Sequence, residues 1–113
     1  MYKELKDKTA IITGSYGGIG TAIAKSFLLN DMKIVLIGRD LKKLENQRLE
    51  LIKIKKSDIS IFQVDVSQQE NFKSAIDEIY KKWKRIDVLV NNAGLTNDNI
   101  ILRLSNEQWD NVI

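Results

Sequence analysis

The chain has 113 residues, of which 43% are hydrophobic and 29% charged, and its net charge is +3; this composition excludes a disordered or fibrous protein and indicates one globular domain. It contains no cysteine and no histidine, which excludes disulfides, thiolate metal sites and the usual general base, and we expect no metal site. No apolar run approaches the roughly 20 residues of a membrane span, and the first ten residues lack the apolar core of a secretory signal.

Short runs with strand character alternate along the chain with longer stretches of helical period. Asn30 and Asp31 suit a left-handed turn after the first helix, and Asp40 is expected to cap the second. Ser67 and Glu70 form a capping-box pattern before the third. The predicted strands are Lys8–Thr13, Lys33–Ile37, Ile59–Val64 and Ile86–Val90; the predicted helices are Ile19–Leu29, Leu41–Lys56, one opening at Ser67 with Phe72, Ile76, Ile79 and Trp83 on its apolar face, and one starting at Ser105.

This alternation predicts an α/β fold, a doubly wound parallel sheet with strand order 3-2-1-4, truncated before a fifth strand. The fourth strand would then form an open, apolar edge that invites association. In such sheets ligands bind at the carboxyl ends of the strands, where the order reverses. The glycine-rich turn after the first strand, Arg39, Asp65 and the segment Asn91–Gly94 all lie at those ends, so we expect the functional site there.

The glycine-rich turn reads TGSYGGIG over residues 13–20 and holds four of the six glycines of the chain. A glycine loop between a strand and a helix lets the backbone approach a pyrophosphate, whose charge the helix amino end meets. The alternative, a flexible hinge, does not predict that the other unusual residues gather at the same edge. The turn residues expected to bind a dinucleotide are Gly14, Ser15, Tyr16, Gly18, Ile19 and Gly20.

Arg39 follows the second predicted strand, where the residue type selects the cofactor. An acidic residue at this place would bind the ribose 2′-hydroxyl of NAD, whereas an arginine suits the 2′-phosphate of NADP. We therefore predict NADP(H) as the cofactor. Asp40 keeps NAD open as an alternative, although a helix cap explains that residue better.

Asn91-Asn92-Ala93-Gly94 follows the fourth predicted strand, and buried amides at such a place need partners. Together with the T-G-x-x-x-G-I-G turn, this segment resembles the short-chain dehydrogenase/reductase family, which has a Rossmann-like fold. The resemblance implies that Asn91 and Asn92 brace the sheet, with Asn91 among the cofactor-binding residues, and that Ala93 and Gly94 let the cofactor ribose lie against the backbone. It also implies that Asp65 and Val66 contact the adenine. The other interpretation of Asp65 is a strand end and helix cap.

The stretch after Gly94 is similar to the 3-oxoacyl-[acyl-carrier-protein] reductases of type II fatty-acid synthesis. This similarity implies NADPH-dependent reduction of a 3-oxoacyl thioester to the 3-hydroxyacyl form, an acidic acyl carrier protein as partner, and a homo-oligomer, a tetramer at full length, in the cytoplasm or in an organelle matrix such as a plastid. Gly17 and Asn97 depart from the relatives, which often carry basic residues there. The matching residues are Thr96, Asp98, Asn99, Arg103, Glu107, Trp109 and Asp110.

The family donates a proton from a tyrosine whose pKa a lysine four residues later lowers, with a serine that polarises the carbonyl. Tyr80 and Lys84 have this spacing, but they precede the fourth strand, so we expect them away from the cofactor. The prediction is therefore a cofactor-binding part, residues 1–113, of a longer reductase, without catalytic residues or turnover of its own. Two alternatives stay open: a dehydrogenase with another carbonyl or alcohol substrate, and a non-catalytic nucleotide-binding protein. No nucleic-acid or membrane partner is expected.

Overall fold

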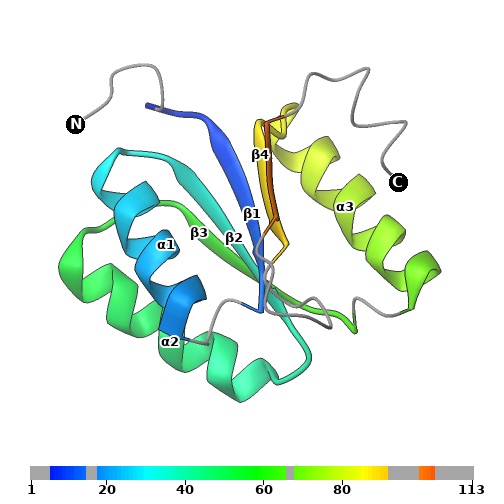
Figure 1. Cartoon of the computed structure of the whole chain (residues 1–113), viewed down its shortest axis with the longest axis horizontal. Helices are drawn as coiled ribbons and strands as arrows, with labels where there is room; N and C mark the ends of the chain where they lie inside the picture. The colour runs from blue at the N-terminus through cyan, green and yellow to red at the C-terminus, as the bar shows by residue number, and fades with distance from the viewer. Residues whose placement is uncertain (1–5, 15–17, 66–67, 92–99, 104–113) are drawn as a thin grey trace.

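The computed structural model describes residues 6–14, 18–65, 68–91 and 100–103 and has one sheet with helices on both faces (Figure 1). The strand order is β3-β2-β1-β4-β5. Among the described residues, no helix is both long and apolar enough to cross a membrane. The elements are β1 (Thr9–Thr13), α1 (Gly18–Leu29), β2 (Lys33–Gly38), α2 (Leu41–Ile54), β3 (Ile59–Gln63), α3 (Gln69–Trp83), β4 (Val88–Asn91) and β5 (Ile100–Arg103).

The first four strands are parallel, and the predicted order 3-2-1-4 is confirmed. In the register of the sheet, Ile11 of β1 lies between Val35 of β2 and Leu89 of β4. All five residues of β1 are buried. The apolar runs of the sequence therefore form a parallel sheet that is covered on both faces, as strands with near-continuous hydrophobic runs require.

Alternate residues of β1 enter two separate cores. Ile12 belongs to the core under α1 and α2, together with Leu28 and Leu44, whereas Ile11 belongs to the core under α3, together with Ile76. In Figure 1, α1 and α2 accordingly lie on one side of the sheet and α3 on the other. Burial of each such aliphatic side chain stabilises the fold by about 1.5 to 3 kcal/mol, so the two cores fix the sheet between its helices.

The helix ends agree with the sequence at two of three predicted places. Asp31 adopts the left-handed conformation, with φ of 61°, after α1. Asp40 caps α2, because its carboxylate accepts the Lys43 N–H at 3.1 Å. The predicted capping box at Ser67 is wrong in register: Gln68 is the N-cap residue of α3, and its side chain makes no cap hydrogen bond. The Gln68 N–H donates to the Asp65 carbonyl at 3.0 Å, and Ser67 itself lies outside the described residues.

The prediction that the fourth strand is a sheet edge is also wrong. Strand β5 pairs with β4 in antiparallel register, with Leu102 opposite Leu89 and Ile101 opposite Val90. The pairing satisfies backbone groups that an open edge would leave without partners. The predicted helix from Ser105 lies outside the described residues.

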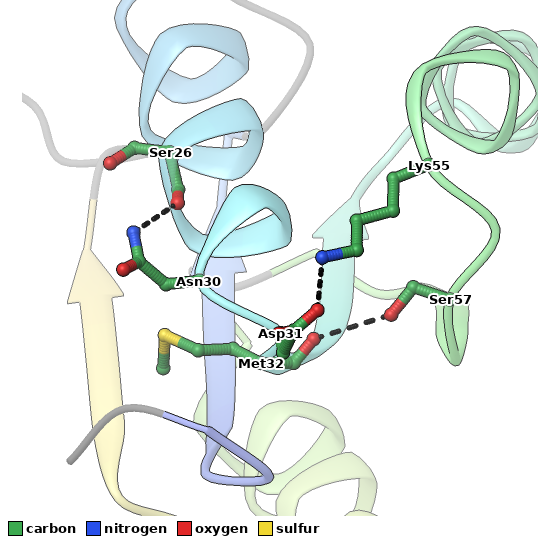
Figure 2. A network of polar contacts seen from close by, with 6 residues as sticks. All are labelled: Ser26, Asn30, Asp31, Met32, Lys55 and Ser57. Carbon is green, nitrogen blue, oxygen red and sulfur yellow. Dashed lines mark hydrogen bonds and ion pairs between the residues drawn. The ribbon is translucent and has the colours of Figure 1, made fainter. Parts of the chain in front are cut away.

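Polar contacts tie two loops together at the amino ends of β2 and β3 (Figure 2). The Lys55 ammonium group pairs with the Asp31 carboxylate. The Ser57 hydroxyl donates to the Met32 carbonyl at 3.5 Å, and the Met32 side chain is fully buried. These contacts connect the segment after α1 with the segment after α2. They fix the amino edge of the sheet, where the parallel strands begin, opposite the carboxyl edge with the glycine-rich turn.

Asp87 joins β1 and β4 at the same edge. Its carboxylate accepts a hydrogen bond from the Thr9 N–H at 2.9 Å and two from the Arg85 guanidinium at 2.7 and 2.8 Å. The backbone N–H of Asp87 in turn donates to the Thr9 carbonyl at 2.9 Å. Partial burial raises the pKa of Asp87, but the hydrogen bonds from Arg85 and Thr9 outweigh this and hold the pKa below its ordinary value. The ionised carboxylate therefore stabilises the folded state.

We predict that Asp87→Asn lowers the free energy of unfolding by about 1 to 2 kcal/mol at neutral pH, because charge-assisted hydrogen bonds are lost. Since the folded pKa is depressed, this contribution is complete above the unfolded pKa of about 4 and is lost as the pH falls through the folded value. Urea denaturation of both proteins at several pH values measures this. A stability difference that stays constant down to pH values below about 3 would contradict the assignment.

Candidate functional site

The carboxyl ends of the four parallel strands meet at one edge of the sheet. Thr13 ends β1 beside Ile37 of β2 and Asn91 of β4, and Gly38 of β2 is opposite Gln63 of β3. The residues that follow these positions are those that the sequence singled out. The structure thus brings the glycine-rich turn, Arg39 and the ends of β3 and β4 to a common edge, as predicted.

Gly14 makes the turn out of β1. Its φ is 60°, in the left-handed region, and its N–H donates to the Ile37 carbonyl at 3.1 Å. Most other residues adopt this conformation at a cost of about 1 to 2 kcal/mol, so the backbone geometry favours glycine here. Ser15, Tyr16 and Gly17 lie outside the described residues.

Gly18 begins α1 and needs a different explanation. A Cβ built at this residue would meet no atom within 4 Å, so the packing of the described residues does not require glycine. The first N–H groups of a helix have no intrahelical acceptors and favour an anion. The open space beside Gly18, among the described residues, leaves room for an anion to approach this helix start. Beside it, Ile19 is 56% exposed and Gly20 is buried.

An open cavity of about 640 Å³ lies between the end of β2, the start of α2 and the end of β3. Asp40 is its one acidic lining residue, and the carboxylate of Asp40 serves as the cap of α2. The Arg39 guanidinium is exposed and makes no hydrogen bond or ion pair with the part of the chain that the structure describes. This set of charges suits an anion, and guanidinium fits phosphate geometry best. The lining residues are Arg39, Asp40, Leu41, Lys42, Lys43 and Gln63.

Lys42 and Lys43 of this cavity were not recognised in the sequence. Both lie in the first turn of α2, which contains no acidic residue. Acidic residues stabilise a first helical turn and cations do not. Two lysines at that place were the available signal for an anion site.

Asp65 lies two residues after β3, is half-buried, and accepts the Gln68 N–H with its backbone carbonyl at 3.0 Å. This geometry agrees with a strand end that leads into α3. Its predicted contact with adenine stays a prediction. Val66, Ala93 and Gly94 lie outside the described residues, and of Asn91 the structure describes only the backbone, at the end of β4.

Tyr80 and Lys84 lie at the opposite edge. Tyr80 is half-buried and packs against the core under α3. Lys84 is the C-cap of this helix, with φ of 63°, and its N–H donates to the Tyr80 carbonyl at 2.7 Å. Because α3 runs from the end of β3 towards the start of β4, its carboxyl end is remote from the glycine-rich turn. The prediction that this pair lies away from the carboxyl ends of the strands is confirmed.

The sequence model of the short chain dehydrogenase family matches residues 8–113. The 3-oxoacyl-[acyl-carrier-protein] reductase FabG of Staphylococcus aureus is 34% identical over 106 residues, covering 94% of this chain and 43% of that protein. The reductase of the same name from Chlamydia pneumoniae is 35% identical over 113 residues, with 96% and 44% covered. L-Sorbose reductase from Gluconobacter frateurii, solved with NADPH and L-sorbose, superposes with a TM-score of 0.75 at 31% identity, covering 93% of this chain and 40% of that one. The chain thus spans less than half the length of these relatives.

Substitution by alanine should change the free energy of unfolding differently at Gly14 and at Gly18. Gly14→Ala should lower the free energy of unfolding by about 1 to 2 kcal/mol, because of its left-handed φ. Gly18→Ala should leave stability unchanged or raise it by up to about 1 kcal/mol, because alanine favours a helix, yet weaken NADPH binding about tenfold or more by filling the open space. Denaturation and calorimetric titration of NADPH measure the two effects. Normal NADPH affinity in Gly18→Ala would exclude a phosphate site there.

Proposed function

This chain belongs to the short-chain dehydrogenase family, and on that premise we propose that residues 1–113 form the NADP(H)-binding part of a reductase. The substrate that we propose is a 3-oxoacyl thioester on acyl carrier protein, reduced to the 3-hydroxyacyl form. The observation that supports NADP(H) as the cofactor is the cation-lined cavity at the end of β2. The identity to reductases of that name, 34% and 35%, supports the choice of substrate.

The glycine-rich turn would hold the pyrophosphate. The N–H groups at the start of α1 would donate to it, and the open space at Gly18 would let it approach the backbone. Ser15 and Tyr16 would line the same turn, and Ile19 and Gly20 would follow it. The bound dinucleotide supplies or accepts the hydride; the residues of this turn bind and orient it.

The cavity beside α2 would bind the 2′-phosphate of the adenosine ribose. Arg39 presents a planar pair of donors that matches two phosphate oxygens, and Lys42 and Lys43 add positive charge. The carboxylate of Asp40 accepts the Lys43 N–H. One oxygen of this carboxylate is thus already used by the helix cap, and loss of the cap would cost about 0.5 to 2 kcal/mol. The cations of the cavity, rather than Asp40, therefore support NADP(H) over NAD.

The remaining contacts follow the family pattern. Asp65 and Val66 would border the adenine, and Asn91, Ala93 and Gly94 would border the ribose next to the nicotinamide. We propose no catalytic residue among residues 1–113, and we expect no turnover by this chain alone. The net charge of +3 suits an acidic carrier protein as partner, and the full-length protein would be a homotetramer.

A second candidate function is reduction of a sugar ketone. It is favoured by the likeness to L-sorbose reductase, which is 31% identical and superposes with a TM-score of 0.75. Both candidates use the same cofactor edge and differ in the substrate alone.

The substrate is tested by NADPH oxidation with the intact natural protein. We expect turnover with acetoacetyl-acyl carrier protein and none above the buffer control with L-sorbose. Turnover with L-sorbose alone would replace the first candidate by the second. Turnover by a protein that consists of residues 1–113 alone would contradict the absence of catalytic residues from them.

The cofactor choice predicts that Arg39→Ala raises the Kd of NADPH about 10- to 100-fold and leaves that of NADH within about twofold, because charge-assisted hydrogen bonds to the phosphate are lost. Lys73→Ala, which removes one exposed cation from α3, is the matched control and should change neither value. Fluorescence titration with both cofactors measures this. Equal losses for NADPH and NADH would show that Arg39 does not select the phosphate.

Tyr80→Phe should leave kcat of the intact protein within about twofold. The hydroxyl lies at the opposite edge, and the phenyl ring keeps its packing against the core under α3. If Tyr80 were the catalytic proton donor, its replacement would instead lower kcat about 10²-fold or more. Steady-state kinetics with NADPH and the thioester substrate decide between these outcomes, and a large loss of kcat would place Tyr80 in the reaction.

A further inference from the structure

Gln63, the last residue of β3, contacts the residue proposed to bind the phosphate. Its Nε2 donates to the backbone carbonyl of Arg39 at 3.0 Å. In the sheet register Gln63 is opposite Gly38, and the Val64 N–H donates to the Gly38 carbonyl at 2.8 Å. The Arg39 carbonyl therefore lies one residue beyond the last backbone pair of β2 and β3. The hydrogen bond to it comes from the side chain of Gln63 instead of from the backbone.

The backbone on the other side of Arg39 is held as well. The Asp40 carbonyl accepts the Leu44 N–H at 3.1 Å, and the Asp40 carboxylate accepts the Lys43 N–H. Three consecutive residues, 38–40, are thus each fixed by a hydrogen bond, from Val64 directly after β3, from Gln63 of β3, or from α2. The Arg39 side chain is exposed and borders the cavity. A backbone fixed before binding lowers the entropy that is lost when the exposed, charged side chain binds its ligand.

From this arrangement we infer that Gln63 is a positioning residue for phosphate recognition, which rests on the proposed function. Its amide fixes the peptide group of Arg39, and so directs the guanidinium to the 2′-phosphate. Gln63 acts through Arg39 and contributes to the preference for NADPH over NADH. NADH binding does not depend on it, because NADH has no phosphate at this place.

The test is a double-mutant cycle in the intact natural protein, with Gln63→Leu, Arg39→Ala and the double variant. Leucine keeps most of the volume of glutamine and removes the donor. We expect Gln63→Leu to raise the Kd of NADPH about three- to tenfold, the effect of one hydrogen bond, and to leave that of NADH within about twofold. In the Arg39→Ala background, Gln63→Leu should have no further effect on NADPH.

Gln69→Leu, the same change at an exposed residue in the first turn of α3, is the matched control and should leave both Kd values unchanged. Equal losses of NADPH and NADH affinity in Gln63→Leu would overturn the inference and reduce Gln63 to a strand-end contact. A full effect that persists without Arg39 would also overturn it, because Gln63 would then contact the phosphate itself. Failure of the proposed function would give a different result from both of these, because NADPH affinity would then be unchanged in Arg39→Ala alone.

Discussion

All five residues of β1 are buried, so helices must cover both faces of the sheet at this strand. Right-handed crossovers place α1 and α2 on one face, and the connection through α3 covers the other. The chain therefore passes from β1 into α1 on one face and from β3 into α3 on the other, and the strand order reverses between β1 and β4. That reversal is where doubly wound sheets bind ligands. The burial of one strand thus creates the place of the site.

The two edges of the sheet have different chemistry. At the amino edge, ion pairs and hydrogen bonds join neighbouring elements, with Asp31 and Lys55 between two loops and Asp87 between β1 and β4. At the carboxyl edge lie a left-handed glycine, the open start of α1 and the exposed Arg39. The polar contacts that stabilise the sheet thus lie at its amino edge, and Arg39 at the carboxyl edge stays exposed beside the cavity.

Periodicity and turn chemistry predicted most of this fold from the sequence. The order of the first four strands, the Asp40 cap and the left-handed Asp31 follow from local rules and are confirmed. Strand β5 was missed, because its antiparallel pairing with β4 depends on tertiary contact and not on a pattern within four residues. Lys42 and Lys43 were missed although two lysines in the first turn of α2 were an available signal. Gln63 was missed because its hydrogen-bond partner, Arg39, follows another strand, and no pattern within β3 indicates that contact.

The most direct measurement of the central claim, that this edge binds NADP(H), is a crystal structure of the intact natural protein grown with NADPH. The account predicts the pyrophosphate over Gly18, the 2′-phosphate beside the Arg39 guanidinium, and Asp40 still capping α2. A structure in which Asp40 leaves the cap to bind the ribose, or in which the dinucleotide lies at another edge of the sheet, would contradict it.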